Sequence, residues 1–302
     1  MSAPLRPGDA VGVLACSDAV PILDRLHSFC GALEGMGLRP RLAGTLERRL
    51  DAERGGADAR PSAPALPPAP ERAAELMGFY ADADVRAVFD VSGGNLSNEL
   101  LDRIDYAFLA AHPKPLFGYS DLTALLNAVH ARAGAPAVLY PALNLVRRDG
   151  ARQQALFRET LLRGGNGLFS LPVSFLAGER MSGPAVGGNL RCFLKLAGTG
   201  YMPDLCGKIL ALESLHGTPA QVLSGFCQLG QLGAFEAVSG VLLGTFTALG
   251  PGPERAYELL CRALDGRVRP DRVLPVAATD RLGHGADSLA LVLGREYTLA
   301  QA

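Results

Sequence analysis

The first half of the chain alternates short apolar runs with longer amphipathic segments, and this alternation limits the fold more than any other feature. Buried strands are predicted at 10–15, 85–92, 114–119 and 135–141. Amphipathic helical patterns at 20–37 and 70–83 come between strands. Strands that alternate with helices are typical of βα units on a largely parallel sheet. The sequence therefore predicts an N-terminal α/β domain over residues 1–145.

The pattern of strands and helices resumes near Gly183 and predicts a second α/β domain over residues 183–302. Its strands are predicted at 207–214, 238–247, 273–280 and 288–299. The segment "GGNLRCFLKLAG" (187–198) is typical of a loop that enters a helix. Residues 146–182 would join the two domains, and a ligand site between them is the default expectation. Residues 50–70 are rich in Ala, Pro and Gly and predict a surface loop.

Charge and hydropathy exclude several classes of partner. Lys and Arg number 29 against 30 Asp and Glu, so the net charge is only −1, which does not favour nucleic acid or an anionic membrane. The N-terminal apolar stretch is interrupted at Ser17 and Asp18, which suits a first strand of a cytoplasmic protein rather than a leader peptide. No run approaches the roughly 18 apolar residues of a membrane span.

Metal and cofactor motifs are missing from the sequence. The six cysteines include no C-x-x-C pair and are expected to be reduced core thiols. Neither H-E-x-x-H nor a Walker sequence nor G-x-G-x-x-G is present, which argues against a zinc peptidase and against an NAD- or ATP-dependent enzyme. We therefore expect no metal and no cofactor.

Ser120 stands in "GYSD", between a predicted strand and a helical pattern. A turn there would expose the hydroxyl, and free N–H groups at the helix start could bind an oxyanion. "GYSD" gives half of the G-x-S-x-G nucleophile elbow, because Leu122 replaces the second glycine. Serine and aspartate are also common helix caps, so this stretch alone favours a cap over a nucleophile.

A second glycine-rich turn follows the predicted strand at 85–92. Gly93 and Gly94 permit backbone conformations closed to other residues, so this turn could direct N–H groups at a carbonyl oxygen. Taken alone, the pair favours an ordinary tight turn.

A serine nucleophile needs a base and a carboxylate that orients it. Among five histidines, His284 has the best position, between glycines in a loop joining two late strands. Glu213 ends an apolar strand and could point into a cleft, although a solvent-exposed loop acid is the simpler interpretation. His216 remains a spare candidate base.

Several stretches together resemble the LD-carboxypeptidase family of serine peptidases, which also contains the microcin C immunity peptidases. The matching stretches begin with "RPGDAVGVLACSD", "DVSGGNLSNELLDRIDY" and "HPKPLFGYSDLTALLNAV", and end with "GPAVGGNLRCFLKLAGTGY", "GKILALES" and "LGHGADSLALVLG". They occur in family order. The resemblance places a catalytic triad on Ser120, Glu213 and His284, and an oxyanion hole on the N–H groups of Asp121 and Gly94.

The resemblance also implies an activity, partners and an assembly. It predicts a homodimeric, metal-free carboxypeptidase that cleaves a terminal amide bond of murein tetrapeptides or of microcin-like peptidyl or aminoacyl nucleotides. We expect Gly93 and Asn95 to contact that substrate. The chain contains no Trp, so a tryptophan cannot stack on a nucleotide base, as it does in some of the immunity group. An inactive ligand-binding homologue of the same fold is the alternative.

Overall fold

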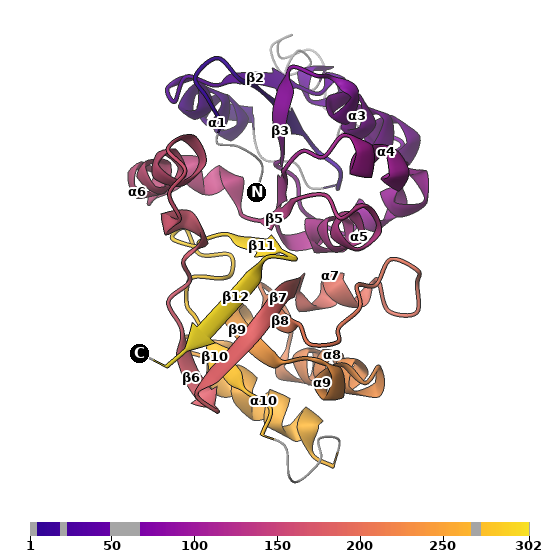
Figure 1. The fold of residues 1–302 in the computed structure, drawn as a ribbon, viewed down its shortest axis with the longest axis vertical. Helices are drawn as coiled ribbons and strands as arrows, with labels where there is room; N and C mark the ends of the chain where they lie inside the picture. Colours follow the sequence, from indigo (N-terminus) through magenta and orange to yellow (C-terminus); the bar gives the residue numbers. More distant parts are fainter. Residues whose placement is uncertain (1–4, 19–22, 49–66, 267–272, 302) are drawn as a thin grey trace, which may run out of the picture.

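The computed structural model describes the chain except for residues 1–4, 19–22, 49–66, 267–272 and 302. Two β-sheets, one above the other in Figure 1, form the centres of two α/β domains. The predicted two-domain α/β fold is therefore confirmed. Most of the surface loop expected at 50–70 lies outside the described residues.

The first sheet has six strands in the order β11-β5-β4-β3-β1-β2, and β1 to β5 pair in parallel. Its strands are β1 (Ala10–Leu14), β2 (Arg39–Leu42), β3 (Val85–Asp90), β4 (Leu116–Gly118), β5 (Ala137–Leu139) and β11 (Leu291–Leu293). Its helices are α1 (Leu23–Glu34), α3 (Ala69–Ala81), α4 (Tyr106–Ala111), α5 (Thr123–Ala133) and α6 (Gly150–Phe157). Figure 1 shows α1 and α6 on one side of this sheet and α3, α4 and α5 on the other.

The core of the first domain is packed with aromatic side chains. Phe89 of β3 stacks on Phe117 of the paired strand β4 with ring centroids 4.7 Å apart. Phe29 of α1 and Phe157 of α6 also contact the Phe89 ring. All four rings are almost fully buried. Such aromatic pairs add about 0.5–1.5 kcal/mol each beyond the burial of their area. This packing fixes β4, and therefore the residues that follow it.

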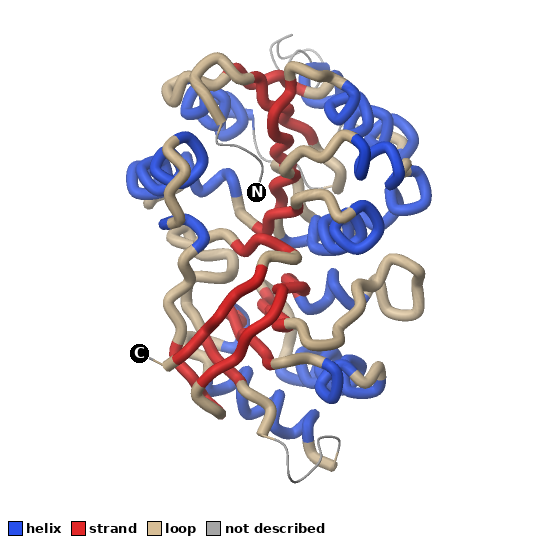
Figure 2. Tube along the Cα trace, viewed as in Figure 1, coloured by secondary structure: helices blue, strands red, loops and turns tan. Residues whose placement is uncertain are grey.

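The second sheet is mixed, in the order β12-β7-β8-β9-β10-β6, with β7 to β10 parallel and both edge strands antiparallel. Its strands are β6 (Ser174–Ala177), β7 (Arg180–Asn189), β8 (Ile209–Ser214), β9 (Gly240–Phe246), β10 (Val276–Ala278) and β12 (Glu296–Ala300). Its helices are α7 (Leu190–Leu194), α8 (Pro219–Gln231), α9 (Ala234–Ala237) and α10 (Glu254–Leu264). The curled strands appear in red in the lower half of Figure 2.

Two features differ from the expected division of the chain. The late run at 288–299 is two strands, because Gly294 adopts a left-handed conformation (φ +74°) and turns the chain from β11 in the first sheet to β12 in the second. The linker expected at 146–182 contains α6, a π-helical turn (Arg158–Leu162), a short 3₁₀ turn (Gly167–Phe169) and β6. The C-terminal segment thus contributes an edge strand to the N-terminal sheet.

The six cysteines are free, as expected, but they are not all core residues. Cys16 and Cys192 are buried, whereas Cys206 and Cys261 are exposed. Within the described ranges, no helix is long and apolar enough to cross a membrane.

Candidate functional site

Ser120 lies on a sharp turn directly after β4. Its φ is +58°, and among the described residues it is the one non-glycine residue with a positive φ. A backbone strained in this way costs about 1–3 kcal/mol and tends to be kept at functional positions. The turn is tight enough that a Cβ on Gly118 would lie 2.9 Å from the Leu122 Cβ, so only glycine fits there. The structure therefore has the elbow geometry even though Leu122 replaces the second glycine of the motif.

The helix-cap interpretation of Ser120 is wrong. Tyr119 occupies the N-cap of the 3₁₀ turn Ser120–Leu122, and Leu122 occupies the N-cap of α5. Neither start has a side-chain capping hydrogen bond. The strained backbone of Ser120 consequently has no role in capping, and its side chain lines a cavity instead.

The side chain of Asp121, the residue after Ser120, is fully buried and holds the turn in place through hydrogen bonds and an ion pair. One carboxylate oxygen accepts hydrogen bonds from the Ser17 hydroxyl (2.7 Å) and the Ser97 N–H (2.8 Å), and the other pairs with the Lys195 ammonium. Burial acts to raise the pKa of Asp121, but the hydrogen bonds from Lys195, Ser17 and Ser97 outweigh it and hold the pKa below its ordinary value. Asp121 is therefore ionised at neutral pH.

This pKa shift predicts a pH dependence of stability. Because the pKa of Asp121 is lower in the folded chain than in the unfolded one, its contribution is fully present above an unfolded value of about 3.9 and is lost as pH falls through the folded value. Urea unfolding of the wild type and of Asp121→Asn between pH 7 and pH 3 tests this. The difference in unfolding free energy should shrink with acid, and a constant difference would contradict the assignment.

Glu213 and His284 come together although 71 residues separate them. Glu213 is the penultimate residue of β8 and is fully buried, with Oε2 2.8 Å from His284 Nδ1. Its other oxygen accepts a hydrogen bond from Asn189 Nδ2 (2.9 Å). The His284 Nε2 atom is buried and has no hydrogen-bond partner in the part of the chain that the structure describes. The Tyr119 ring packs edge-on against His284, with centroids 5.1 Å apart, so the imidazole lies beside the residue that precedes Ser120.

Groups from the other domain hold the His284 loop in place. Arg147 donates to the His284 carbonyl (3.0 Å) and Asn144 donates to the Gly285 carbonyl (2.9 Å). Within the loop, the Ser288 hydroxyl donates to the Gly283 carbonyl (2.8 Å). The loop that carries the His284 imidazole is therefore held in place by hydrogen bonds from Asn144 and Arg147.

The glycine turn after β3 lies close to the elbow. Gly94 has φ +111°, and a Cβ there would lie 2.2 Å from the Asp18 carboxylate. Asn95 donates its N–H to Asp18 and accepts a hydrogen bond from Arg191 at its side-chain oxygen (2.9 Å). Gly94 and Asn95 line the same cavity as Ser120, whereas Gly93 does not. The turn thus needs glycine at 94 for a close approach to Asp18.

Two cavities flank the candidate residues. Ser120 lines one of about 820 Å³, whose wall includes Arg191 and Lys195 but, among the residues that the structure describes, no Asp or Glu. His284 lines a neighbouring one of about 900 Å³, and Leu215 lines both. Each volume falls in the range of small-ligand sites.

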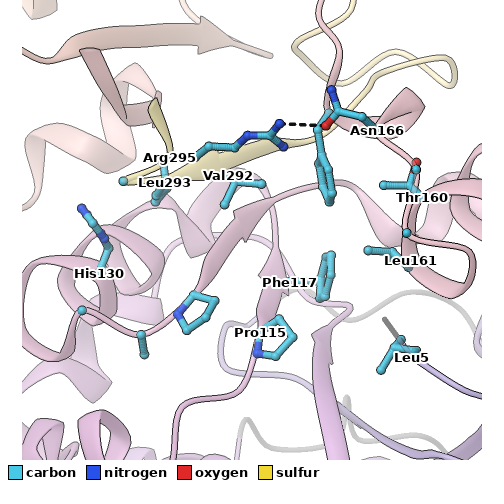
Figure 3. Close-up of a pocket in the computed structure, with 17 residues that line it drawn as sticks. Leu5, Pro115, Phe117, His130, Thr160, Leu161, Asn166, Val292, Leu293 and Arg295 are labelled. Carbon is cyan, nitrogen blue, oxygen red and sulfur yellow. Dashed lines mark hydrogen bonds between the residues drawn. The ribbon is translucent and has the colours of Figure 1, made fainter. Parts of the chain in front are cut away.

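A third cavity, of about 870 Å³, lies at the opposite end of β4 (Figure 3). Pro115 and Phe117 line it, whereas Ser120 follows the strand. Arg295 donates to the side-chain oxygen of Asn166 (2.8 Å) at its edge, as Figure 3 shows. None of the residues expected in the site lines this cavity.

Comparison with known proteins matches both halves of the chain. The model of the LD-carboxypeptidase N-terminal domain matches residues 11–140, and the model of the C-terminal domain of that family matches residues 182–299. The chain belongs to the LD-carboxypeptidase family. The family consists of serine hydrolases, so the expected enzyme class is confirmed.

Curated relatives of this LD-carboxypeptidase cover most of its length. The murein tetrapeptide carboxypeptidase of Pseudomonas aeruginosa is 30% identical over 85% of this chain and 79% of the relative. The microcin C7 self-immunity protein MccF of Escherichia coli is 26% identical over 89% of this chain and 86% of its own. A solved MccF structure superimposes with a TM-score of 0.82 at 24% identity, covering 99% of this chain and 95% of that one. This last likeness supports the fold.

Proposed function

We propose that this LD-carboxypeptidase hydrolyses a terminal amide bond through an acyl-enzyme on Ser120. The observation that carries the proposal is a strained, cavity-facing Ser120 whose preceding residue, Tyr119, packs against the His284 imidazole, together with the contact of His284 Nδ1 with the buried Glu213 carboxylate. Glu213 would hold the Nδ1–H of His284 and stabilise the imidazolium, which leaves Nε2 free to accept the Ser120 proton. That is the arrangement that a serine nucleophile requires.

The reaction would proceed in two halves. His284 Nε2 takes the Ser120 proton while Oγ attacks the carbonyl carbon, and the oxyanion that forms accepts hydrogen bonds from the N–H groups of Asp121 and Gly94. His284 then protonates the leaving amine, which departs and leaves the acyl-enzyme. Water enters, gives its proton to His284 and attacks the ester, and the returned proton frees Ser120.

The substrate proposed is a murein tetrapeptide, which would lose its terminal D-alanine, or a microcin-like peptidyl or aminoacyl nucleotide. One relative is a murein tetrapeptide carboxypeptidase and another is the microcin C7 self-immunity protein MccF. One solved structure of MccF is a complex with glutamyl sulfamoyl guanosine. Lys195 is already paired with Asp121, whereas Arg191 in the cavity wall donates to the neutral oxygens of Gly94 and Asn95, so the Arg191 charge favours a substrate that carries a carboxylate near the scissile bond. Asn95 is proposed to contact this substrate. Gly93 was expected to contact it too but lies outside the cavity wall.

The cytoplasmic location and the homodimer implied by the resemblance belong to the same proposal.

A cleavage assay tests the substrate. The purified chain is incubated separately with a murein tetrapeptide and with an aminoacyl sulfamoyl adenosine, and the products are identified by mass spectrometry. We expect release of D-alanine from the first or of the amino acid from the second. Release of neither product would contradict the proposed function.

Covalent labelling separates a hydrolase from an inactive binding homologue. A fluorophosphonate probe should modify Ser120, because the probe reacts with a serine whose proton has a nearby base. Peptide mapping by mass spectrometry would place the added mass on the peptide that contains Ser120. A chain that binds substrate yet remains unlabelled would be the inactive homologue.

A further inference from the structure

Lys195, which directly follows α7, contacts both segments that carry the proposed oxyanion donors. Its ammonium donates to the Asn95 carbonyl (2.6 Å), one residue after Gly94, and pairs with the carboxylate of Asp121. Only 17% of the Lys195 side chain is exposed. A single cation from the second domain therefore joins the glycine turn to the elbow of the first domain.

The peptide plane that follows Gly94 is held at both ends. Arg191 donates to the Gly94 carbonyl (2.9 Å), and Asp18 accepts the N–H of Asn95. Lys195 then holds the next carbonyl, that of Asn95. With these groups fixed, the chain after Gly94 has little freedom to rotate, so the position of Gly94 depends on Arg191 and Lys195.

We propose that Lys195 is a positioning residue that sets the separation of the Gly94 and Asp121 N–H groups. This inference rests on the proposed function, since these two groups matter only if an oxyanion forms between them. Oxyanion donors work within a narrow range of about 2.7–3.1 Å from the developing charge. The contacts of Lys195 with the Asn95 carbonyl and the Asp121 carboxylate would keep both N–H groups in that range.

Kinetics of Lys195→Met test the role in catalysis. We expect kcat to fall by about 10²-fold, as for the loss of one oxyanion donor, with KM changed by less than about threefold. Affinity for a boronic-acid analogue, which forms a tetrahedral adduct on Ser120, should fall with kcat, while affinity for the cleaved product should not. Equal losses of analogue and product binding would show a merely structural role and overturn the proposal.

A matched control is available in Lys208. Its side chain is 18% exposed and pairs with one carboxylate, that of Asp204, before the start of β8 and away from the glycine turn. Lys208→Met should leave kcat unchanged within about twofold. A similar loss of kcat in both variants would attribute the effect to a lost lysine in general and would overturn the proposal.

A double variant separates positioning from charge neutralisation. Lys195→Met alone leaves the buried Asp121 carboxylate without its cation, which can prevent folding. Asp121→Asn combined with Lys195→Met removes both charges and should fold. If Lys195 positions the turn through Asn95, kcat of the double variant stays about 10²-fold low. Recovery of wild-type kcat would show that Lys195 only neutralises Asp121.

Hydrogen exchange tests the positioning role of Lys195 even if the chain cleaves no tested substrate. Amides of residues 93–96 should exchange at least about tenfold faster in the double variant than in Asp121→Asn alone. Unchanged exchange there would overturn the positioning role of Lys195. A wild type that shows neither turnover nor labelling of Ser120 would instead refute the proposed function, so the two failures are distinct.

Discussion

Replacement of Ser120 by alanine is expected to lower kcat by about 10⁴-fold or more while the chain still folds. The substitution removes the one atom that would form the acyl bond and leaves the buried core untouched, because the Ser120 side chain faces a cavity. Single-turnover kinetics on the substrate identified by the cleavage assay would measure the loss, and circular dichroism would confirm the fold. A variant that retains wild-type turnover would exclude Ser120 as the nucleophile.

The left-handed backbone of Ser120 adds a matched control. Glycine adopts a φ of +58° without strain, whereas alanine pays a cost of about 1 kcal/mol or more there. Ser120→Gly should therefore unfold at a higher urea concentration than Ser120→Ala, although both lack activity. Equal or reversed midpoints would mean that the elbow relaxes on substitution and that the strain is not imposed by the surrounding packing.

Four of the five parallel strands of the first sheet could be predicted because each is a short apolar run bounded by turn residues, whereas β2, with the sequence RPRL, was not predicted. β1, β3, β4 and β5 fall within the predicted runs at 10–15, 85–92, 114–119 and 135–141. The carboxyl ends of parallel strands lie along one edge of a sheet, where ligands of α/β folds gather. Asp18, Gly94 and Ser120 each follow one of these ends, so the local pattern of apolar runs was enough to locate this part of the site.

The strand β7 could not be predicted from the same pattern. It contains three glycines and a proline among its ten residues, which dilute the apolar run and resemble a loop. The glycines serve packing: a Cβ on Gly187 would lie 2.1 Å from the Ala211 carbonyl oxygen of the neighbouring strand. Close approach to another strand depends on the tertiary structure, and a single segment does not reveal it.

The side chains that hold the site in place could not be predicted either, because their roles depend on contacts between distant segments. The buried carboxylate of Asp121, the ammonium of Lys195 and the amide of Asn189 each meet partners more than twenty residues away. Only Asn189 had a local indication, since it follows two glycines at the start of a helix. The N–H group of Asp121 was expected in the site, but its side chain was not.

Replacement of Glu213 by glutamine is expected to lower kcat by about 10⁴-fold, comparable to the loss measured when a triad carboxylate becomes an amide. Both oxygens of Glu213 accept hydrogen bonds, one at His284 Nδ1 and one from Asn189 Nδ2. Glutamine offers one acceptor and one donor group, so it cannot accept hydrogen bonds from both His284 Nδ1–H and Asn189 Nδ2. If its NH₂ faces His284, the imidazole proton moves to Nε2, which can no longer accept the proton of Ser120.

A second substitution should restore part of this loss. In Glu213→Gln with Asn189→Asp, the glutamine NH₂ can donate to the new carboxylate while its oxygen accepts the Nδ1–H of His284. Aspartate at 189 can still cap α7 by accepting the Cys192 N–H, as Asn189 does. We expect kcat of the double variant to exceed that of Glu213→Gln by about tenfold or more, since the correct tautomer returns although the charge has moved away from His284. If the double variant has the same kcat as Glu213→Gln, the loss of kcat would come from the missing negative charge at residue 213 and not from the tautomer of His284.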